Sequence, residues 1–186
     1  LPHTCDGYQF QSRDQDDVSI EVKLTSNQTE STRWLIGGYY AEIERDVAVS
    51  YGADLGKGFE FSSYVPATGK NPTDLAFDDT FTTDVFSIFG QYSIDLSDAT
   101  ELSLEGRYDK EKRSVDNNVP ARSSALYYGG GAPINPAMTA GGSKIPSRDK
   151  SYDQFQPKIS LTTTAENTTI YASYGVGFRS GGFNSS

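Results

Sequence analysis

The chain has 186 residues, and 25 acidic against 16 basic side chains give it a net charge of −9. This sign excludes a general nucleic-acid binder, because attraction to phosphate requires a basic surface. Cys5 is the single cysteine, which excludes an intrachain disulfide framework. The longest apolar stretch, residues 34–41, is far shorter than the about 20 apolar residues of a transmembrane helix. Membrane β-strands stay possible, because they need apolar residues only at every second position.

Six segments alternate in polarity with period two, which predicts β-strands with one apolar face. In chain order they are residues 18–25, 33–44, 85–96, 101–109, 154–162 and 169–178. The clearest is 85–96, in which Ile88 and Ile94 share one face and Gln91 and Ser93 share the other. The segment 33–44 is the least regular, since it is apolar on both faces.

The connections between these segments alternate short, long, short, long, short. The long ones, residues 46–81 and 115–152, hold most of the prolines and glycines and are expected to be irregular. Loops of this length argue against a compact soluble domain. They are typical of outer-membrane barrels, which have short turns on the periplasmic side and long loops outside. The sequence therefore predicts an all-β fold, an antiparallel up-and-down transmembrane β-barrel segment of about six long strands with two long extracellular loops.

Two faces follow from this fold. We expect the apolar face to contact lipid and the polar face to line the lumen. The lipid-facing set includes Ile88, Ile94, Leu104, Ile159 and Leu161. The lumen-facing set is Gln91, Glu105, Arg107, Gln156 and Lys158. Aromatic residues are expected at the two boundaries of the membrane, with Phe86, Tyr108, Phe155 and Phe178 at the outer one and Trp34 at the inner one.

Three parts of the chain have distinctive strand sequences. They are RWLIGGYY at 33–40, preceded by EVKLTS at 21–26; FSIFGQY at 86–92, followed by LSLEGRY at 102–108; and PKISL at 157–161 with IYASYGVGFRSGGFN at 170–184. These parts resemble barrel strands of TonB-dependent outer-membrane receptors. The resemblance spans most of the chain from Val18 to Asn184 and leaves out the long loops.

The resemblance implies that residues 1–186 are part of a β-barrel domain of about 22 strands in the bacterial outer membrane. The plug domain, the TonB box and the C-terminal strands of the family are absent, so we expect an internal fragment. The implied function is active import of a scarce nutrient, with an iron–siderophore complex as the expected ligand and TonB as the source of energy. The implied partners are outer-membrane lipid and lipopolysaccharide, the nutrient ligand, and TonB through the missing N-terminal region.

We expect no catalytic residue, no cofactor and no metal in this chain. His3 and Cys5 could supply two metal ligands, but a site needs three or four. Tyr64, Tyr127 and Tyr128 are expected to contact the ligand, because aromatic side chains on loops are good amphipathic anchors. The basic run at 110–113 suits lipopolysaccharide phosphates, although a solvated strand end explains it equally well.

Two other functions remain open. A soluble β-sandwich that binds carbohydrate or protein would explain the alternation, but not the long loops between regular hairpins. A passive outer-membrane porin has the same physical pattern and needs no TonB. A plug domain upstream would distinguish the receptor from the porin.

Overall fold

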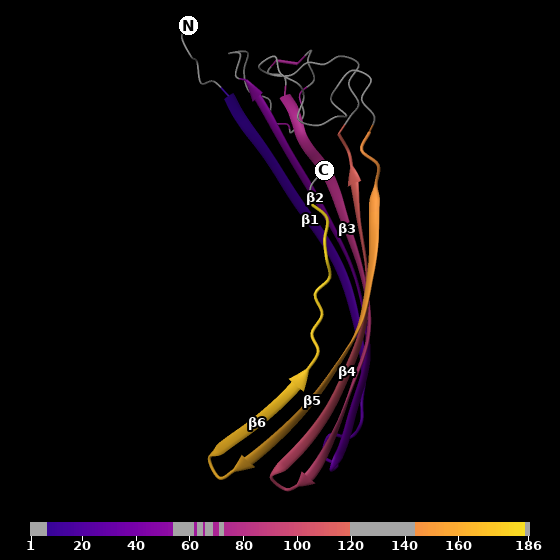
Figure 1. Cartoon of the computed structure of the whole chain (residues 1–186), viewed down its shortest axis with the longest axis vertical. Helices are drawn as coiled ribbons and strands as arrows, with labels where there is room; N and C mark the ends of the chain where they lie inside the picture. Colours follow the sequence, from indigo (N-terminus) through magenta and orange to yellow (C-terminus); the bar gives the residue numbers. More distant parts are fainter. Residues whose placement is uncertain are drawn as a thin grey trace.

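The computed structural model describes residues 7–53, 62, 65, 69–70, 73–119 and 144–184. They form a single antiparallel sheet of six strands in the order β1-β2-β3-β4-β5-β6 (Figure 1). The strands are β1 Gly7–Thr25, β2 Thr32–Ala53, β3 Thr73–Ser97, β4 Thr100–Asn117, β5 Arg148–Ala165 and β6 Thr168–Gly175. Each strand pairs with the next one along the chain, so the predicted all-β, up-and-down arrangement is confirmed, and the sheet is open. No helix in the described ranges is long and apolar enough to cross a membrane.

All the short turns lie at one end of the sheet, and the strand ends joined by the long connections lie at the other (Figure 1). We call these the turn end and the loop end. The predicted alternation of short and long connections is therefore confirmed. The longest strand, β3, has 25 residues, well above the about 9–11 that cross a bilayer. The strands therefore continue beyond the thickness of a membrane towards the loop end.

The predicted bounds of the irregular stretches were wrong at the loop end. Residues 46–53, 73–81, 115–117 and 148–152 were expected in loops and belong to strands. In these extensions the convex positions become polar, as Asp46 and Thr80 show on β2 and β3, while the apolar Val47 and Val49 occupy concave positions. The apolar convex face that marks a strand in the sequence therefore disappears, although the backbone ladder continues.

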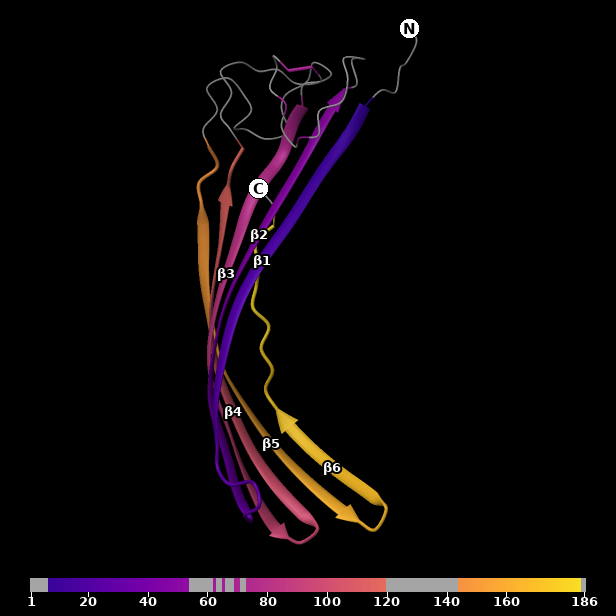
Figure 2. The same ribbon diagram turned by 180° about the vertical axis from the view of Figure 1, so that it is seen from behind.

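Strand β6 ends at Gly175, three residues before the predicted end at 178. The amide of Val176 donates to the carbonyl oxygen of Pro157 at 2.9 Å. Pro157 has no N–H to return this bond, so the reciprocal ladder bond cannot form. Beyond this point residues 176–184 leave the ladder and run along the concave side of the curved sheet (Figures 1 and 2).

The two faces of the sheet differ in chemistry. The convex face is apolar between the turn end and the middle of the strands, and its side chains are open, with Val18 73% and Ile88 56% exposed. Buried apolar side chains gather mainly at the loop end, among them Val49, Leu75 and Val115. The described residues form one layer, whereas a β-sandwich requires two packed sheets. Within the described residues nothing covers the convex face, which therefore needs an apolar environment.

A row of aromatic side chains marks the loop-end limit of the apolar convex surface. Tyr40 pairs with Phe86, and Tyr108 pairs with Phe155 one step nearer the turn end. The hydroxyl of Tyr40 donates to Glu42 at 3.2 Å, and that of Tyr108 donates to Asp153 at 3.3 Å. Rings on apolar surface with hydroxyl groups on polar residues are the arrangement of a membrane interface.

Near the turn end, Trp34 pairs with Tyr92 on the same convex face. The predicted outer member Phe178 does not belong to the aromatic row, because it follows the end of β6. The other predicted interface residues lie at the levels expected from the alternating pattern.

Candidate functional site

The five predicted lumen-facing residues lie together on the concave face. Register places Gln91 beside Glu105 and Glu105 beside Lys158. The next row towards the loop end places Arg107 beside Gln156. All five line one shallow hollow of 430 Å³, which we call the middle hollow. Residues paired across an antiparallel ladder share a face, so alternation together with register brings this set together.

Charges in the middle hollow are neutralised by partners within it or beside it. Lys158 Nζ lies 2.9 Å from Glu105 Oε1. Arg107 donates from Nε to Asp109 Oδ1 at 2.7 Å and from Nη2 to Ser87 Oγ at 2.8 Å. Gln156 and Ser87 also donate to the Asp109 carboxylate. The network joins β3, β4 and β5 and leaves little net charge in this region.

An aromatic side chain separates two cations beside this network. The Phe89 ring lies 5.8 Å from Lys23 Nζ and 5.7 Å from Arg107 Cζ. Its ring also covers the backbone of Gly37, where an added Cβ would lie 2.4 Å from Phe89 Cζ. This contact was not predictable from the sequence, because Lys23, Gly37 and Arg107 come from three other strands.

An ion cluster closes the concave face near the turn end. Arg33 binds Asp95 through two bonds, at 2.8 and 2.6 Å, and its Nη2 lies 2.5 Å from Glu101 Oε2. These partners lie 62 and 68 positions from Arg33 in the chain. A bidentate guanidinium–carboxylate pair of this kind ties β2 to β3 and β4. The separation explains why the sequence alone did not reveal the cluster.

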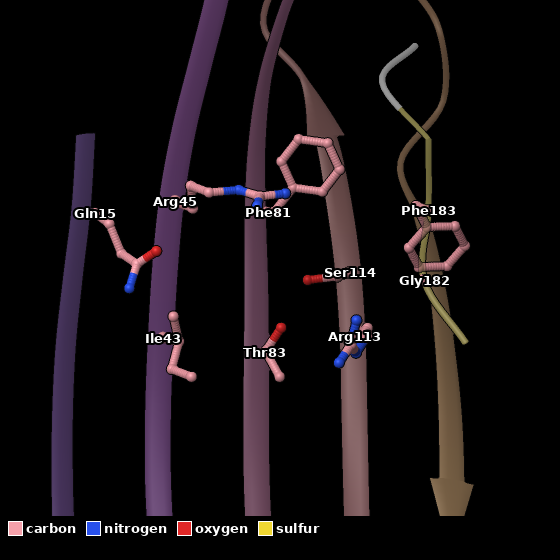
Figure 3. A pocket seen from close by; sticks show the side chains of 9 residues that line it. All are labelled: Gln15, Ile43, Arg45, Phe81, Thr83, Arg113, Ser114, Gly182 and Phe183. Carbon is pink, nitrogen blue, oxygen red and sulfur yellow. The ribbon is translucent and has the colours of Figure 1, made fainter. Parts of the chain in front are cut away.

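A second hollow lies on the concave face closer to the loop end, and we call it the outer hollow. It has a volume of 130 Å³ and lies between the strands and residues 182–183. Figure 3 shows Arg45 extending from β2 towards the ring of Phe81 on β3, and its guanidinium carbon is 4.8 Å from the ring centre. Arg113 of β4 and the ring of Phe183 complete the wall. Phe81 was not expected at this position, because residues 46–81 were predicted to be irregular.

Other predicted site residues lie outside the described residues. These are the expected ligand contacts Tyr64, Tyr127 and Tyr128, together with His3 and Cys5. Within the ranges that the structure describes, no group of three or more His, Cys, Asp or Glu side chains could hold a metal ion.

The basic run at 110–113 is divided between the two faces. Its even-numbered residues, Lys110 and Lys112, pair with Phe86 and Asp84 on the convex face. Arg113 lines the outer hollow and forms an ion pair with Glu111 on the concave face.

A family described as TonB dependent receptor-like, beta-barrel, matches residues 5–186. The chain belongs to the TonB-dependent receptor family. This is a family of outer-membrane transport receptors of Gram-negative bacteria, and it is a transporter rather than an enzyme family. No curated protein matches the chain significantly. Within a receptor barrel, the curved up-and-down sheet corresponds to a section of the wall.

Proposed function

We propose that this chain forms part of the wall of an active-transport receptor that imports a scarce nutrient, with energy supplied through TonB. An iron–siderophore complex is the proposed ligand, as the resemblance implies. The observation that carries the proposal is the opposite chemistry of the two faces of one sheet, together with the family match. An exposed apolar convex face suits lipid, and a polar concave face suits a water-filled or plugged interior.

In this proposal the middle hollow faces the lumen. Gln91, Glu105, Arg107, Gln156 and Lys158 contact either the plug domain or the moving ligand. Outer-membrane lipid and lipopolysaccharide cover the convex face. The long loops hold part of the ligand gate, and their tyrosines at 64, 127 and 128 contribute ligand contacts.

The two other functions have less support. A soluble β-sandwich requires a second sheet over the apolar face, and the described residues form one sheet. A porin shares the barrel wall, but the family match favours a receptor.

An uptake assay tests the transport function. The full-length receptor is expressed in cells that lack their own ferric–siderophore receptors, and uptake of a panel of radiolabelled ferric siderophores is measured with and without TonB. We expect uptake of at least one complex, and we expect it to disappear without TonB. Uptake of a complex that persists without TonB would identify a passive channel, and no uptake of any complex would reject the proposed ligand class.

Thiol labelling tests the orientation of the faces. In a receptor from which Cys5 and any cysteine outside these 186 residues have been removed, Gln91→Cys and Ile88→Cys place single thiols on opposite faces of β3. In the full-length receptor in bilayers, we expect a water-soluble maleimide to label position 91. We expect a lipid-soluble quencher to reduce the fluorescence of a fluorescent label attached at position 88. The reverse pattern would reject the lumen assignment.

A further inference from the structure

Residues 176–184, which we call the strap, follow β6 but do not continue it. The ladder between β5 and β6 ends at the pair of Lys158 and Gly175, and the last backbone bond beyond it joins Val176 to Pro157. The strap then runs along the concave side of the sheet (Figures 1 and 2). In the described part of the chain, the edge of β5 beyond this point therefore has no neighbouring strand, although the strap lies beside it.

A side-chain hydrogen bond holds the strap where it leaves the ladder. The amide of Phe178 donates to Gln156 Oε1 at 3.1 Å, and Nε2 of the same glutamine donates to the Asp109 carboxylate. A carboxylate only accepts hydrogen bonds, so this contact turns the glutamine oxygen towards the strap. Asp109 is held in turn by Arg107 and Ser87. Gln156 is therefore a positioning residue that joins the strap to the network of the middle hollow.

The rest of the strap lies against concave side chains rather than against the backbone of β5. A Cβ added at Gly181 would lie 2.7 Å from the hydroxyl oxygen of Tyr152, whose ring tip supplies the other nearest atoms. The ring centre of Phe183 lies 5.7 Å from the guanidinium carbon of Arg148, and Phe183 also lines the outer hollow (Figure 3). The strap thus occupies space on the concave side that a continuous strand would leave open.

The register of β5 and β6 defines a second position for the same residues. Continued without a shift, this register pairs Phe178 with Phe155, which would bring Phe178 into the aromatic row. It also pairs Gly181 with Tyr152, the side chain beside which Gly181 already lies. The two positions therefore differ by a sideways displacement, and the strap need not slide along β5.

The ladder breaks at the height where the apolar convex surface ends. Phe155 belongs to the aromatic row at that limit, and residues 148–154 of β5 lie beyond it. Backbone groups in hydrocarbon must be paired within the protein, whereas those outside it can bond to water. Both positions of the strap are thus compatible with the same membrane-spanning ladder. Pro157, which has no N–H to donate, weakens the position in the ladder.

We propose that the strap is a gate with two positions. In the inward position, which the structure shows, it lies on the concave face and forms one wall of the outer hollow. In the outward position it continues β6 along the edge of β5 and widens the concave space. The bond from Phe178 to Gln156 stabilises the inward position, and backbone pairing with β5 stabilises the outward one. This inference rests on the proposed function, because the strap narrows the transport path only if the concave face lines that path.

Disulfide formation distinguishes the two positions. The full-length receptor, freed of its other cysteines and placed in lipid vesicles, carries Gln154→Cys and Arg179→Cys. In the outward register these residues form a non-hydrogen-bonded pair, since the neighbouring bonded pair is that of Val176 and Pro157. Such a pair is close enough for a disulfide, whereas in the inward position the side chains of β5 separate the two backbones. The disulfide yield under a mild oxidant therefore measures the outward fraction.

Matched variants test the role of Gln156. Gln156→Leu removes the acceptor of the Phe178 amide, and Gln91→Leu makes the same change at a glutamine of the middle hollow that bonds to Ser93 instead. We expect Gln156→Leu to raise the ratio of outward to inward strap about fivefold, the effect of one lost hydrogen bond, and Gln91→Leu to change it less than about twofold. Pro157→Ala should also raise this ratio, because it restores a ladder donor.

Three results would overturn the two positions. They are no increase in disulfide yield with Gln156→Leu, an equal increase with Gln91→Leu, and no disulfide in any variant. Resistance to unfolding in SDS confirms that each variant is folded.

Thiol labelling tests whether the strap narrows the concave space. Thr83 lies on β3 and lines the outer hollow together with Phe183 of the strap (Figure 3). In a receptor with Thr83→Cys as its single thiol, we expect Gln156→Leu to speed the reaction with a water-soluble maleimide and Gln91→Leu to leave the rate unchanged. An unchanged rate with Gln156→Leu would overturn the gate.

The proposed function and this inference fail separately. If TonB-dependent uptake is intact but Gln156→Leu changes neither the disulfide yield nor the labelling rate, only the gate is wrong. If uptake does not depend on TonB, the receptor function is wrong whatever the position of the strap.

Discussion

Gly37 is the residue of β2 at which the sheet leaves no room for a side chain. Its Cβ would lie 2.4 Å from Phe89 Cζ and 2.9 Å from the carbonyl oxygen of Val22. The ring can rotate away, but the backbone oxygen of β1 cannot. The neighbouring Gly38 is on the convex face, and the nearest atom to its Cβ is 3.9 Å away. The two adjacent glycines therefore have different roles.

We predict that Gly37→Ala destabilises the barrel by about 1–3 kcal/mol, the usual cost of overpacking, and displaces Phe89 from Lys23 and Arg107. Gly38→Ala is the matched control and should change stability by less than about 0.5 kcal/mol. Urea unfolding of the full-length receptor in bilayers measures both. Equal effects at the two positions would show that the contact with Phe89 does not constrain β2.

Asp78 is a residue whose ionisation opposes folding. It lies on the convex side of β3, eight positions beyond Phe86 towards the loop end, and thus outside the membrane-spanning part. Burial raises the pKa of Asp78 above its ordinary value, and the nearby carboxylates of Asp46 and Asp79 raise it further, against a hydrogen bond from Asn118 that lowers it. The protonated form is therefore favoured by the folded state.

The raised pKa of Asp78 predicts how the free energy of unfolding depends on pH. A raised folded-state pKa gives a stabilising contribution that is complete below the ordinary pKa and is lost as pH rises through the raised value. We predict that Asp78→Asn, which stays neutral, slows hydrogen exchange at the loop ends of β2–β4 at pH 7. At pH 3 wild type and variant should exchange alike. A variant that exchanges faster at pH 7 would contradict the assignment.

At the scale of elements, the pairing of β5 with β6 ends where Pro157 stands. The carbonyl of Pro157 accepts from Val176, but its nitrogen cannot donate in return. The chain then leaves the ladder, and the amide of Phe178 uses the side chain of Gln156 instead, at 3.1 Å. The missing N–H donor of Pro157 thus coincides with the end of β6.

We predict that Pro157→Ala extends β6 by two or more residues, because the restored N–H completes the bonded pair with Val176. Hydrogen exchange at Val176 and Phe178 in the full-length receptor should slow measurably. Pro146→Ala, in the segment that precedes β5, is the control for the entropic effect of removing a proline. Unchanged exchange at both amides would show that Pro157 does not end the pairing.

At the scale of the whole molecule, the open convex face requires lipid and the concave face does not. Leu35 and Ile36 are adjacent apolar residues of β2 on opposite faces, and Ile36 is 51% exposed on the convex side. Leu35 lines the middle hollow among charged side chains. Leu35 and Ile36 therefore allow the two faces to be compared at nearly the same strand position and with nearly the same type of side chain.

We predict that Ile36→Lys destabilises the receptor in bilayers by about 2–4 kcal/mol, the cost of a lysine on the lipid face of a barrel, whereas Leu35→Lys costs about 1 kcal/mol or less. Urea unfolding in lipid vesicles measures the difference. Equal costs at the two positions would mean that the convex face does not contact hydrocarbon.

Within the membrane-spanning part, the fold was largely predictable from the sequence. Lipid on one face requires an apolar residue at every second position, and this requirement is visible in pairs such as Ile88 and Gln91. The five polar residues of the middle hollow were predictable for the same reason, since alternation assigns each to the other face. The extensions of the strands at the loop end were not predictable, because the convex positions become polar there and the apolar residues, such as Val47 and Val49, lie on the concave face instead.

The sequence by itself therefore determined the class of fold, the six strands and the identity of their two faces, because period-two alternation is a local property of the chain. Only the tertiary structure decided which side chains meet across strands, since register joins residues such as Arg33 and Asp95 that are 62 positions apart. The same register brings Arg45 to Phe81.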